Sequence, residues 1–311
     1  MEERVQRPKI LILAGGWSRE REVSLKSGEG VYGCIPKDLY EVTLCDPKED
    51  MALLFSHLKD VDLVINLLHG QKGEDGSMQG FLEILGVRYL GSRVTASAVA
   101  MDKYISKLIY QKAGLLVPKA VPVFEREDLN EERIKGLGLP LIVKPINEGS
   151  SVGLSLCEDL SSAMKALKEG LEMGMRMLAE EYIQGRELTC CVIGNRELMA
   201  LPIIEIIPLH SKVFDYTSKY EAGKTMEICP ADIDEDVAKM VKDTAITSHK
   251  ALGLRTWSRT DMILKEGKIY ILETNTLPGM TPNSLFPLAA KAMGWDMTQL
   301  VLKLIKLGLE D

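Results

Sequence analysis

Short apolar runs alternate with amphipathic stretches along the first hundred residues, a pattern typical of an α/β layer. The runs in KILILAGG (9–16) and VDLVINLLHG (61–70) predict two buried strands that each end in a loop with glycine. Open α/β sheets bind ligands at the carboxyl ends of their strands. We therefore expect the loop HGQKGEDGSMQG (69–80) to form one wall of a site. A helical pattern over residues 96–114 then predicts a helix that leads out of this layer.

Two further groups of apolar runs follow, and each predicts several strands. The runs are LPLIVKP (139–145), LSLC (154–157) and MRMLAEEYI (175–183) in the first group, and ELTCCVIG (187–194) and ELMALPIIEIIPL (197–209) in the second. A helical pattern at 161–173 lies within the first group. Nearer the carboxyl end, apolar residues at helical spacing predict a helix that stops at Gly253. A capping-box pair, Asp296 and Gln299, predicts the start of the last helix.

This grouping predicts three domains in a fold of the α/β class, with α+β character in part. An N-terminal domain with a parallel sheet should span residues 1–100, a central domain 101–186 and a C-terminal domain 187–311. Residues 208–230 show no clear helical or strand period. Because a long structureless loop in a compact protein is usually functional, we expect this segment to be a lid.

The composition is that of a soluble globular protein, with 46% hydrophobic and 27% charged residues. A net charge of −7 argues against a nucleic-acid partner. No apolar stretch is long enough to span a membrane, and the amino terminus has no secretory pattern, so we expect no membrane partner. The six cysteines lack the spacing of a metal site or a disulfide framework. They are interpreted as reduced core residues of a cytoplasmic protein.

The stretch LETNTLPGM (272–280) ends an apolar run with a carboxylate and an amide. Glu273 and Asn275 would share one face of a strand, because successive strand residues point to opposite faces. A plain strand end running into a turn is the alternative interpretation of these nine residues. The preceding run ends in KEG, and a three-residue hairpin loop at 265–267 would place glycine where a left-handed residue is wanted.

The register of that hairpin decides which residues share the face. With the three-residue loop, Asp261 falls opposite Ile271 and Arg259 falls opposite Glu273, so that Arg259, Asp261, Glu273 and Asn275 all project from one face. A two-residue loop would instead put Asp261 and Glu273 on opposite faces. The interpretation of this stretch therefore depends on the register.

Two carboxylates on one face favour a bound cation. At a separation of about 4 Å they repel by roughly 4 kcal/mol at an effective dielectric of 20, and a divalent metal removes that cost. Two carboxylates and an amide, without histidine or cysteine, suit Mg²⁺, which is usually held by few protein groups together with phosphates. The alternative is a salt-bridged sheet in which Arg259 neutralises both acids.

A small-residue loop in IVKPINEGSSVGL (142–154) supplies a candidate phosphate site. Lys144 ends a buried strand, and the backbone N–H groups of the loop can approach an anion closely. The loop matches neither the P-loop nor the dinucleotide fingerprint. An ordinary flexible hairpin is the alternative, but together with the metal face the loop is a candidate cover for ATP.

The combination of motifs resembles D-alanine–D-alanine ligase, an ATP-grasp enzyme. The motifs are GGWSREREVSLKSG, HGQKGEDGSMQG, MDK, VKPINEGSSVG, FDYTSKY and RTDMIL…LETNTLPGMTPNSL, in family order across residues 14–289. The resemblance implies that ATP, with Mg²⁺ or else Mn²⁺, is gripped between the central and C-terminal domains. ATP would phosphorylate a first D-alanine, and a second D-alanine would attack the acyl phosphate to give D-alanyl-D-alanine for peptidoglycan precursors. The family also implies a cytoplasmic homodimer.

The resemblance assigns roles to single residues by their match to the family motifs. The magnesium ligands are Asp261, Glu273 and Asn275. The ATP contacts are Lys103, Lys144 and Lys219 on the phosphates, Glu180, Glu181, Tyr182 and Ile183 at the adenine hinge, and Glu187 on the ribose. The first substrate is held by Glu20, which is linked through Ser150 to Tyr220, and Lys219 also belongs to the substrate set. The oxyanion site is formed by Arg259 and the backbone of Gly279. The second-substrate pocket is formed by Ser284 and Leu285, and His69 lies near the attacking amine.

Several assignments have simpler alternatives. Lys103 could be a solvated helix lysine. His69 could be a loop histidine without a proton-transfer role, and Ser150 could simply form a turn. Trp17 stands where the family is expected to have a small polar residue. Relatives that make D-alanyl-D-lactate lack the lysine-tyrosine pair of the lid, so Lys219 and Tyr220 favour a D-amino acid as acceptor. A nucleotide-binding regulator without chemistry is the alternative function, and the joint presence of Glu20, Tyr220 and Arg259 argues against it.

Overall fold

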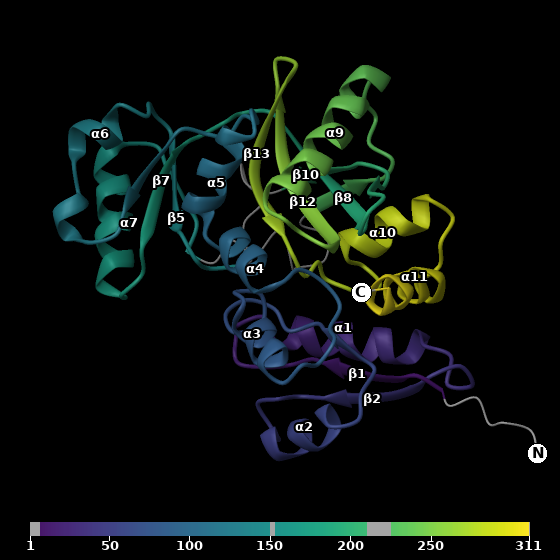
Figure 1. Cartoon of the computed structure of the whole chain (residues 1–311). Coiled ribbons are helices and arrows are strands. Elements are labelled where there is room, and N and C mark those ends of the chain that lie inside the picture. The colour runs from purple at the N-terminus through teal and green to yellow at the C-terminus, as the bar shows by residue number, and fades with distance from the viewer. Residues whose placement is uncertain (1–6, 150–152, 210–224, 311) are drawn as a thin grey trace, which may run out of the picture.

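Three β-sheets organise the chain, as the computed structural model shows for residues 7–149, 153–209 and 225–310. The N-terminal sheet lies at the bottom of Figure 1, the central sheet at the left and the C-terminal sheet at the upper right. Their strand orders are β2-β1-β3, β4-β7-β5-β6 and β11-β10-β8-β12-β13, with β9 paired to β8. The expected mixed α/β class is confirmed.

The N-terminal sheet is parallel, as predicted. Its elements are β1 (Lys9–Leu13), α1 (Arg21–Cys34), β2 (Glu41–Cys45), α2 (Met51–Leu58), β3 (Leu63–Asn66) and α3 (Ser77–Ile84). All four residues of β3 are buried, because helices cover both faces of a parallel sheet. Strands β1 and β3 end at the same edge, so the loops that contain Glu20 and His69 leave the sheet side by side.

A two-helix connection leads to the central sheet, and it corrects the prediction of one helix over residues 96–114. Helix α4 (Val94–Met101) stops at Asp102, whose backbone is extended, and α5 (Lys103–Lys112) begins at the next residue. The Asp102 carboxylate accepts hydrogen bonds from the backbone N–H groups of Tyr104 and Ile105. Asp102 therefore caps α5, and it fixes Lys103 in the first turn of that helix.

The central sheet is antiparallel. Its elements are β4 (Ala120–Val123), a 3₁₀ turn η1 (Arg126–Asp128), α6 (Glu131–Lys135), β5 (Leu141–Pro145), β6 (Ser155–Cys157), α7 (Leu160–Glu172) and β7 (Met177–Glu181). Leu141, Val143 and Ala179 pack with α7 in one buried cluster. Because side chains alternate along a strand, Lys144 and Glu180 point to the opposite face, toward the C-terminal sheet.

The C-terminal sheet carries the longest strands. Its elements are β8 (Arg186–Gly194), β9 (Met199–Ala200), β10 (Ile204–Pro208), β11 (Thr225–Ile228), α9 (Glu235–Ala251), β12 (Thr256–Lys265), β13 (Lys268–Asn275), α10 (Leu285–Ala292) and α11 (Met297–Leu309). The run 197–209 is divided between β9 and β10, and β11 is a strand within the segment 208–230, where none was predicted. Gly253 follows α9 with a positive φ of 65°, and the capping box of Asp296 and Gln299 is present.

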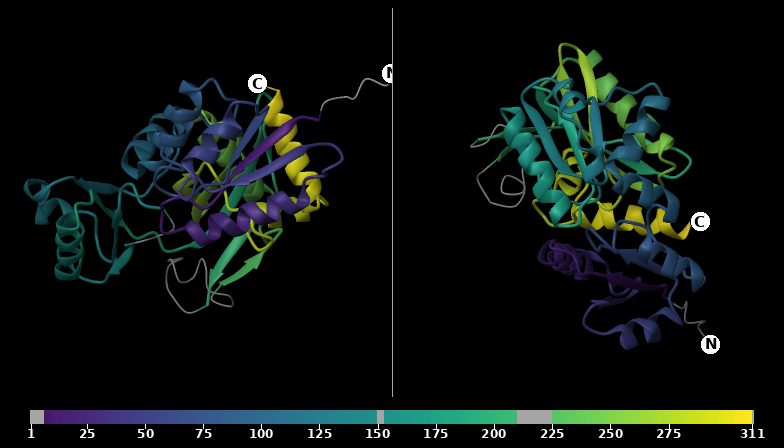
Figure 2. Two further views of the ribbon diagram at one scale, coloured as in Figure 1. Left: turned by 90° about the horizontal axis from the view of Figure 1, so that it is seen from below. Right: turned by 90° about the vertical axis from the view of Figure 1, so that its left-hand side faces the viewer.

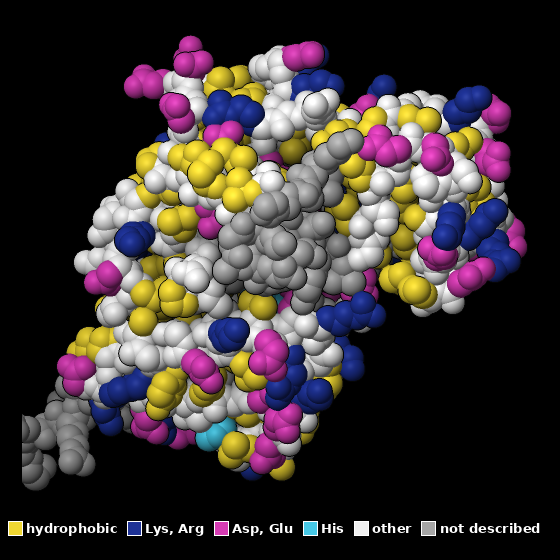
Figure 3. Space-filling view, turned by 180° about the vertical axis from the view of Figure 1, so that it is seen from behind, with side chains coloured by type: hydrophobic (Ala, Val, Ile, Leu, Met, Phe, Trp, Pro, Cys, Tyr) yellow, Lys and Arg dark blue, Asp and Glu magenta, His cyan; other side chains and the backbone are white. Residues whose placement is uncertain are grey.

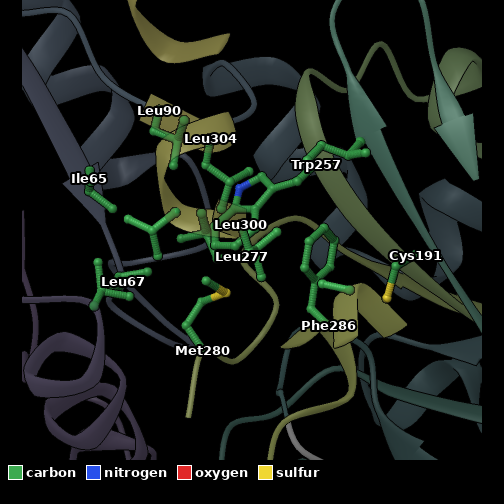
Figure 4. Packing of buried hydrophobic residues seen from close by; sticks show 14 of the residues in the cluster. Ile65, Leu67, Leu90, Cys191, Trp257, Leu277, Met280, Phe286, Leu300 and Leu304 are labelled. Carbon is green, nitrogen blue, oxygen red and sulfur yellow. The ribbon is translucent and has the colours of Figure 1, made fainter. Parts of the chain in front are cut away.

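The largest buried cluster joins the first and last parts of the chain (Figure 4). Ile65 and Leu67 of the N-terminal layer pack in the same cluster as Leu300 and Leu304 of α11. Trp257 and Phe286 lie edge to face within it, with ring centroids 5.4 Å apart. Figures 1 and 2 show α11 beside the N-terminal sheet. The N-terminal layer therefore completes its core with the last helix of the chain rather than by itself.

The compositional expectations concern the surface charge, membrane spans and the cysteines. Acidic and basic side chains are interspersed over the face in Figure 3. Within the described ranges, no helix is long and apolar enough to cross a membrane. All six cysteines are free thiols, but Cys34 and Cys229 are only partly buried, which corrects the expectation that all six lie in the core.

Candidate active site

The hairpin of β12 and β13 has a two-residue turn, so the predicted three-residue loop is wrong. Lys265 pairs with Lys268, and Glu266 and Gly267 between them both have positive φ, at 49° and 71°. Two positive φ values are typical of the tight turns that match the twist of a hairpin. The predicted pairings of Asp261 with Ile271 and of Arg259 with Glu273 are wrong as well.

A β-bulge nevertheless brings the polar residues to one face. Met262 pairs with Ile271, but Asp261 pairs with Glu273, so Leu272 is the extra residue on β13. Without the bulge, the two-residue turn would place the two carboxylates on opposite faces. With the bulge, Asp261 lies directly opposite Glu273, and Arg259 lies directly opposite Asn275. The predicted shared face is confirmed by a different register from the one predicted.

Asp261 is buried and is bound on both of its oxygens. The Arg259 guanidinium donates two hydrogen bonds to it, at 2.9 Å to Oδ1 and 2.7 Å to Oδ2. The hydroxyl of Thr189, on the neighbouring strand β8, donates a third bond of 2.6 Å to Oδ1. Burial lowers the pKa of Arg259, but the adjacent carboxylate outweighs it, so that this pKa is raised above its ordinary value. Arg259 therefore carries a permanent charge at this face.

Glu273 faces the first turn of α5. The Lys103 ammonium lies 3.5 Å from Glu273 Oε2 and donates a 2.5 Å hydrogen bond to the backbone carbonyl of Glu148. Lys103 is only 7% exposed, so it is not the solvated helix lysine of the alternative interpretation. It links three elements, namely α5, β13 and the loop after β5.

A buried trio of charges lies on the face of the central sheet that points toward the C-terminal sheet. Glu180 on β7 is 3.0 Å from Lys144 on β5 through Oε2, and 3.0 Å from Lys107 on α5 through Oε1. Burial raises the pKa of Glu180, but the two ammonium groups offset this and lower it below its ordinary value. Burial also lowers the pKa of Lys107 to about 8, although Glu180 works against that shift.

A cavity of about 350 Å³ lies between the central and C-terminal sheets. Its lining includes all four hinge residues, two lysines and two of the predicted metal ligands, namely Glu180, Glu181, Tyr182, Ile183, Lys103, Lys144, Asp261 and Glu273. Glu187 also lines it. Among the described residues, those predicted to contact ATP therefore share one cavity with Asp261 and Glu273. Its volume is within the range of small-molecule sites.

A second, small cavity of about 30 Å³ continues this site toward the N-terminal layer. It shares Lys103, Glu148 and Glu273 with the larger cavity and adds Asn275 and Glu74. Asn275, the third predicted metal ligand, therefore lines the smaller cavity, next to the shared residue Glu273.

Glu20 lies at the start of α1, where the two loops approach each other. A methyl group placed on Gly70 would come within 3.1 Å of Glu20 Oε2, and one placed on Gly149 within 2.7 Å. These glycines belong to the loops that follow β3 and β5. Only residues without a side chain can bring their backbones this close to the carboxylate. Glu20 therefore joins the N-terminal layer to the central domain, at the place where the resemblance puts the first substrate.

His69 is buried beside two carboxylates. Its Nδ1 is 4.0 Å from Glu74 Oε1, and Glu74 Oε2 accepts a 2.8 Å hydrogen bond from the backbone N–H of Gly70. Burial lowers the pKa of His69, but Glu74 and Glu20 outweigh it, and the pKa is raised above its ordinary value. His69 Nε2 is buried and has no hydrogen-bond partner among the described residues.

The loop after β13 is tightly packed. Gly279 lies against Ser284, since a methyl group at Gly279 would come within 2.8 Å of Ser284 Oγ. The Ser284 hydroxyl bonds to the backbone N–H and the hydroxyl of Thr281, at 3.1 Å and 2.8 Å. The side chain of Leu285 is buried in the core, so its main-chain N–H, in the first turn of α10, is the part left for a substrate.

Three predicted site residues, Ser150, Lys219 and Tyr220, lie outside the described residues. Four residues of the site were missed by the sequence analysis, namely Glu74, Lys107, Glu148 and Thr189. The sequence could have indicated Lys107, because this residue lies four positions after Lys103 and therefore on the same helix face.

Trp17 is 39% exposed, and the Lys72 ammonium lies 5.3 Å from its ring centroid.

Comparisons with known proteins agree with this geometry. The model of the "D-ala D-ala ligase C-terminus" family matches residues 109–306, and that of the "D-ala D-ala ligase N-terminus" family matches residues 52–92. The chain belongs to the D-alanine–D-alanine ligase family. Family members include the D-alanine–D-alanine ligase of Syntrophobacter fumaroxidans, which is 45% identical over 97% of this chain and 98% of its own. The ligase of Desulfotalea psychrophila is 44% identical over 99% of this chain and 97% of its own.

Solved structures of the family have the same fold. The Bacillus anthracis D-alanine–D-alanine ligase complexed with ATP superposes with a TM-score of 0.86 at 33% identity, covering 97% of this chain and 98% of that one. The VanG D-Ala:D-Ser ligase of Enterococcus faecalis superposes with a TM-score of 0.82 at 32% identity, covering 97% and 100%. A D-alanine–D-alanine ligase and a D-Ala:D-Ser ligase therefore both resemble this chain over nearly its whole length.

Proposed function

We propose that this enzyme joins two D-alanines to D-alanyl-D-alanine in an ATP-dependent reaction that passes through an acyl phosphate. The observation that carries the proposal is the meeting of two groups of residues in one cavity. Lys103, Lys144 and the hinge line it from one side, and Asp261 and Glu273 line it from the other. Phosphoryl transfer between two anions needs positioning and cations, and this cavity offers both.

ATP would lie between the two sheets. The hinge from Glu180 to Ile183 would take the adenine and Glu187 the ribose, while Lys103 and Lys144 would face the phosphates. Lys219 is proposed as the third phosphate contact, from the segment outside the described residues. All of these positions apart from Lys219 line the same cavity, which supports the arrangement.

The donor set at the hairpin fits Mg²⁺. Asp261 and Glu273 lie directly opposite each other, and Asn275 follows two residues later on the same face. Among the described residues, no group of three or more His, Cys, Asp or Glu side chains could hold a metal ion by itself, and the proposed set has only two carboxylates beside an amide. The three hydrogen bonds from Arg259 and Thr189 leave about one lone-pair site of the Asp261 carboxylate for a metal ion. When bound, the ion would neutralise charge on the transferred phosphate.

The substrates would lie between this face and the N-terminal layer. Glu20 would hold the ammonium group of the first D-alanine, which places the carboxylate of that substrate toward ATP. Attack of the second amine gives a tetrahedral adduct, whose oxyanion the Arg259 guanidinium and the Gly279 N–H would stabilise. Ser284 and Leu285 would contact the second D-alanine.

His69 would lie near the attacking amine. Its buried Nε2 has no hydrogen-bond partner among the described residues, so it is available to a substrate. Ser150 and Tyr220 are proposed to complete the link from Glu20 to the lid.

A product assay tests this function. The enzyme is offered D-alanine alone, or D-alanine with D-serine or D-lactate, in the presence of ATP and Mg²⁺, and the products are identified by mass. D-alanyl-D-alanine with equimolar phosphate is the expected result with D-alanine alone. Exclusive formation of the serine dipeptide or the lactate depsipeptide from the mixtures would overturn the acceptor assignment. No D-alanine-dependent phosphate release at all would favour the nucleotide-binding regulator.

Three further expectations belong to this proposal. The division into residues 1–100, 101–186 and 187–311 is supported by the three sheets, and the segment 208–230 is the proposed lid. A cytoplasmic homodimer is proposed because the family implies one. Gel filtration with light scattering tests the dimer, and a monomer at micromolar concentration would contradict it.

A further inference from the structure

The inward face of α5 is unusually polar for a buried helix face. Lys103, Ser106, Lys107 and Tyr110 are its buried residues, at spacings that place them on one side. Two lysines one turn apart therefore point from one helix into the protein. Lys103 lines the cavity, but Lys107 lies behind it and is 3% exposed. The proposed function gives a role to Lys103 and none to Lys107.

Lys107 is held by one carboxylate oxygen. Its ammonium lies 3.0 Å from Glu180 Oε1, and the Lys144 ammonium lies 3.0 Å from Glu180 Oε2. Each lysine thus takes one oxygen of the same buried carboxylate. Burying an ammonium group costs several kcal/mol, so a lysine kept in this place indicates a purpose beyond packing.

The charge balance of the trio depends on Lys107. Lys144 and Glu180 alone would form a neutral pair, in which the carboxylate could turn both oxygens to Lys144. With Lys107 present, the three groups carry a net positive charge at the wall of a cavity proposed to hold a polyphosphate. The Lys144 ammonium also keeps donor hydrogens for a phosphate, because it shares Glu180 with a second cation.

We propose that Lys107 is a positioning residue for nucleotide binding. By holding one oxygen of Glu180, it fixes the Glu180 carboxylate and leaves the Lys144 ammonium directed at the phosphates. This role rests on the proposed function only in that the cavity binds ATP. Lys107 does not line the cavity, so it acts through Glu180 and Lys144.

The first test compares Lys107→Met with Lys107→Arg. Methionine keeps an unbranched side chain of similar length but removes the positive charge, whereas arginine keeps the charge. The matched control is Lys112→Met, a change at an exposed lysine on the same helix. Affinity for ADP is measured by calorimetry, and KM for ATP and kcat are measured by phosphate release. Lys107→Met should weaken ADP binding and raise KM for ATP by roughly tenfold, about the effect of losing one charge-assisted hydrogen bond from Lys144 to a phosphate.

The second readout separates positioning from a merely structural role. The groups that face Lys107 are Glu180 from β7, Lys144 from β5 and Glu273 from β13. Because Lys107 loses its proton near pH 8, ADP affinity in the wild type should fall as the pH rises through that value. Lys107→Arg should restore most of the affinity lost in Lys107→Met, and both variants should lack this alkaline fall.

A double-mutant cycle tests the route through Glu180. In a Glu180→Gln background, Lys107→Met should cause little further loss of ADP affinity, because the carboxylate that transmits its effect is gone. Equal losses in both backgrounds would overturn the proposal. So would wild-type ADP affinity in Lys107→Met, with a change only in its melting temperature.

The outcome stays decisive if Lys107→Met fails to fold. An alkaline fall in Lys107→Arg at the wild-type pH would then overturn the proposal, since arginine does not titrate there. ADP binding needs no D-alanine. A wild type that binds ADP but releases no phosphate with D-alanine would contradict the proposed function and leave this inference intact.

Discussion

Replacing Asp261 with asparagine removes the counter-charge of a buried arginine. The side chains of Arg259 and Asp261 are 12% and 5% exposed and share two hydrogen bonds. Asparagine keeps one acceptor oxygen but presents an N–H₂ group to the second guanidinium donor. Breaking a buried ion pair typically costs 3–5 kcal/mol, and Glu273 on the facing strand position compensates in part. We therefore expect Asp261→Asn to lower the free energy of unfolding by about 3 kcal/mol.

Urea unfolding followed by circular dichroism measures this loss. The control is Glu172→Gln, which removes the partner of Arg126 in a pair whose side chains are 68% and 59% exposed. Because exposed pairs contribute little, the control should lose less than about 1 kcal/mol. Asp261→Asn should also need more Mg²⁺ for half-maximal turnover. Losses of equal size in the two variants would refute the account of the buried pair.

Two other changes test separate parts of the structure. Gly149→Ala would place a methyl group 2.7 Å from Glu20 Oε2, so KM for the first D-alanine should rise several-fold; an unchanged KM would remove Glu20 from the substrate site. Burial lowers the pKa of His249 to about 4, so the stability it contributes is complete above its unfolded value near 6.5 and is lost as the pH falls toward 4. The wild type should therefore lose up to about 3 kcal/mol more than His249→Gln between pH 7 and pH 4, and equal losses in the two proteins would contradict this.

The metal face shows how far the sequence carries such an argument. The pattern in LETN predicted the strand end and the shared face, and both are correct. The register that led there was wrong, because KEG fits both a two-residue and a three-residue turn. Leu272 is an ordinary apolar residue, and nothing in its identity marks it as the extra residue of a bulge. The predicted face is correct because the shorter turn and the bulge each shift the pairing by one residue, and the two shifts together return Asp261 and Glu273 to the same face.

Other parts of the site depend on contacts between distant segments. Asp102 ends one helix and caps the next through its own side chain, which a helical period of apolar residues does not reveal. Lys107 and Glu180 are far apart in the sequence, so their pairing follows from the docking of α5 on the central sheet. The motifs of the resemblance located Lys103, Lys144 and the hinge, and all of these line the cavity.

The most direct test of the central claim compares the wild type with Glu273→Gln in one assay. Both proteins are incubated with ATP, Mg²⁺ and D-alanine, and D-alanyl-D-alanine and phosphate are quantified together. Glu273 is partly exposed in the cavity wall, so the substitution should leave the folded state intact by circular dichroism. The account predicts dipeptide and phosphate in equal amounts from the wild type and loss of most turnover in the variant. Wild-type turnover in Glu273→Gln would contradict the metal assignment, and a wild type that forms no dipeptide would contradict the ligase.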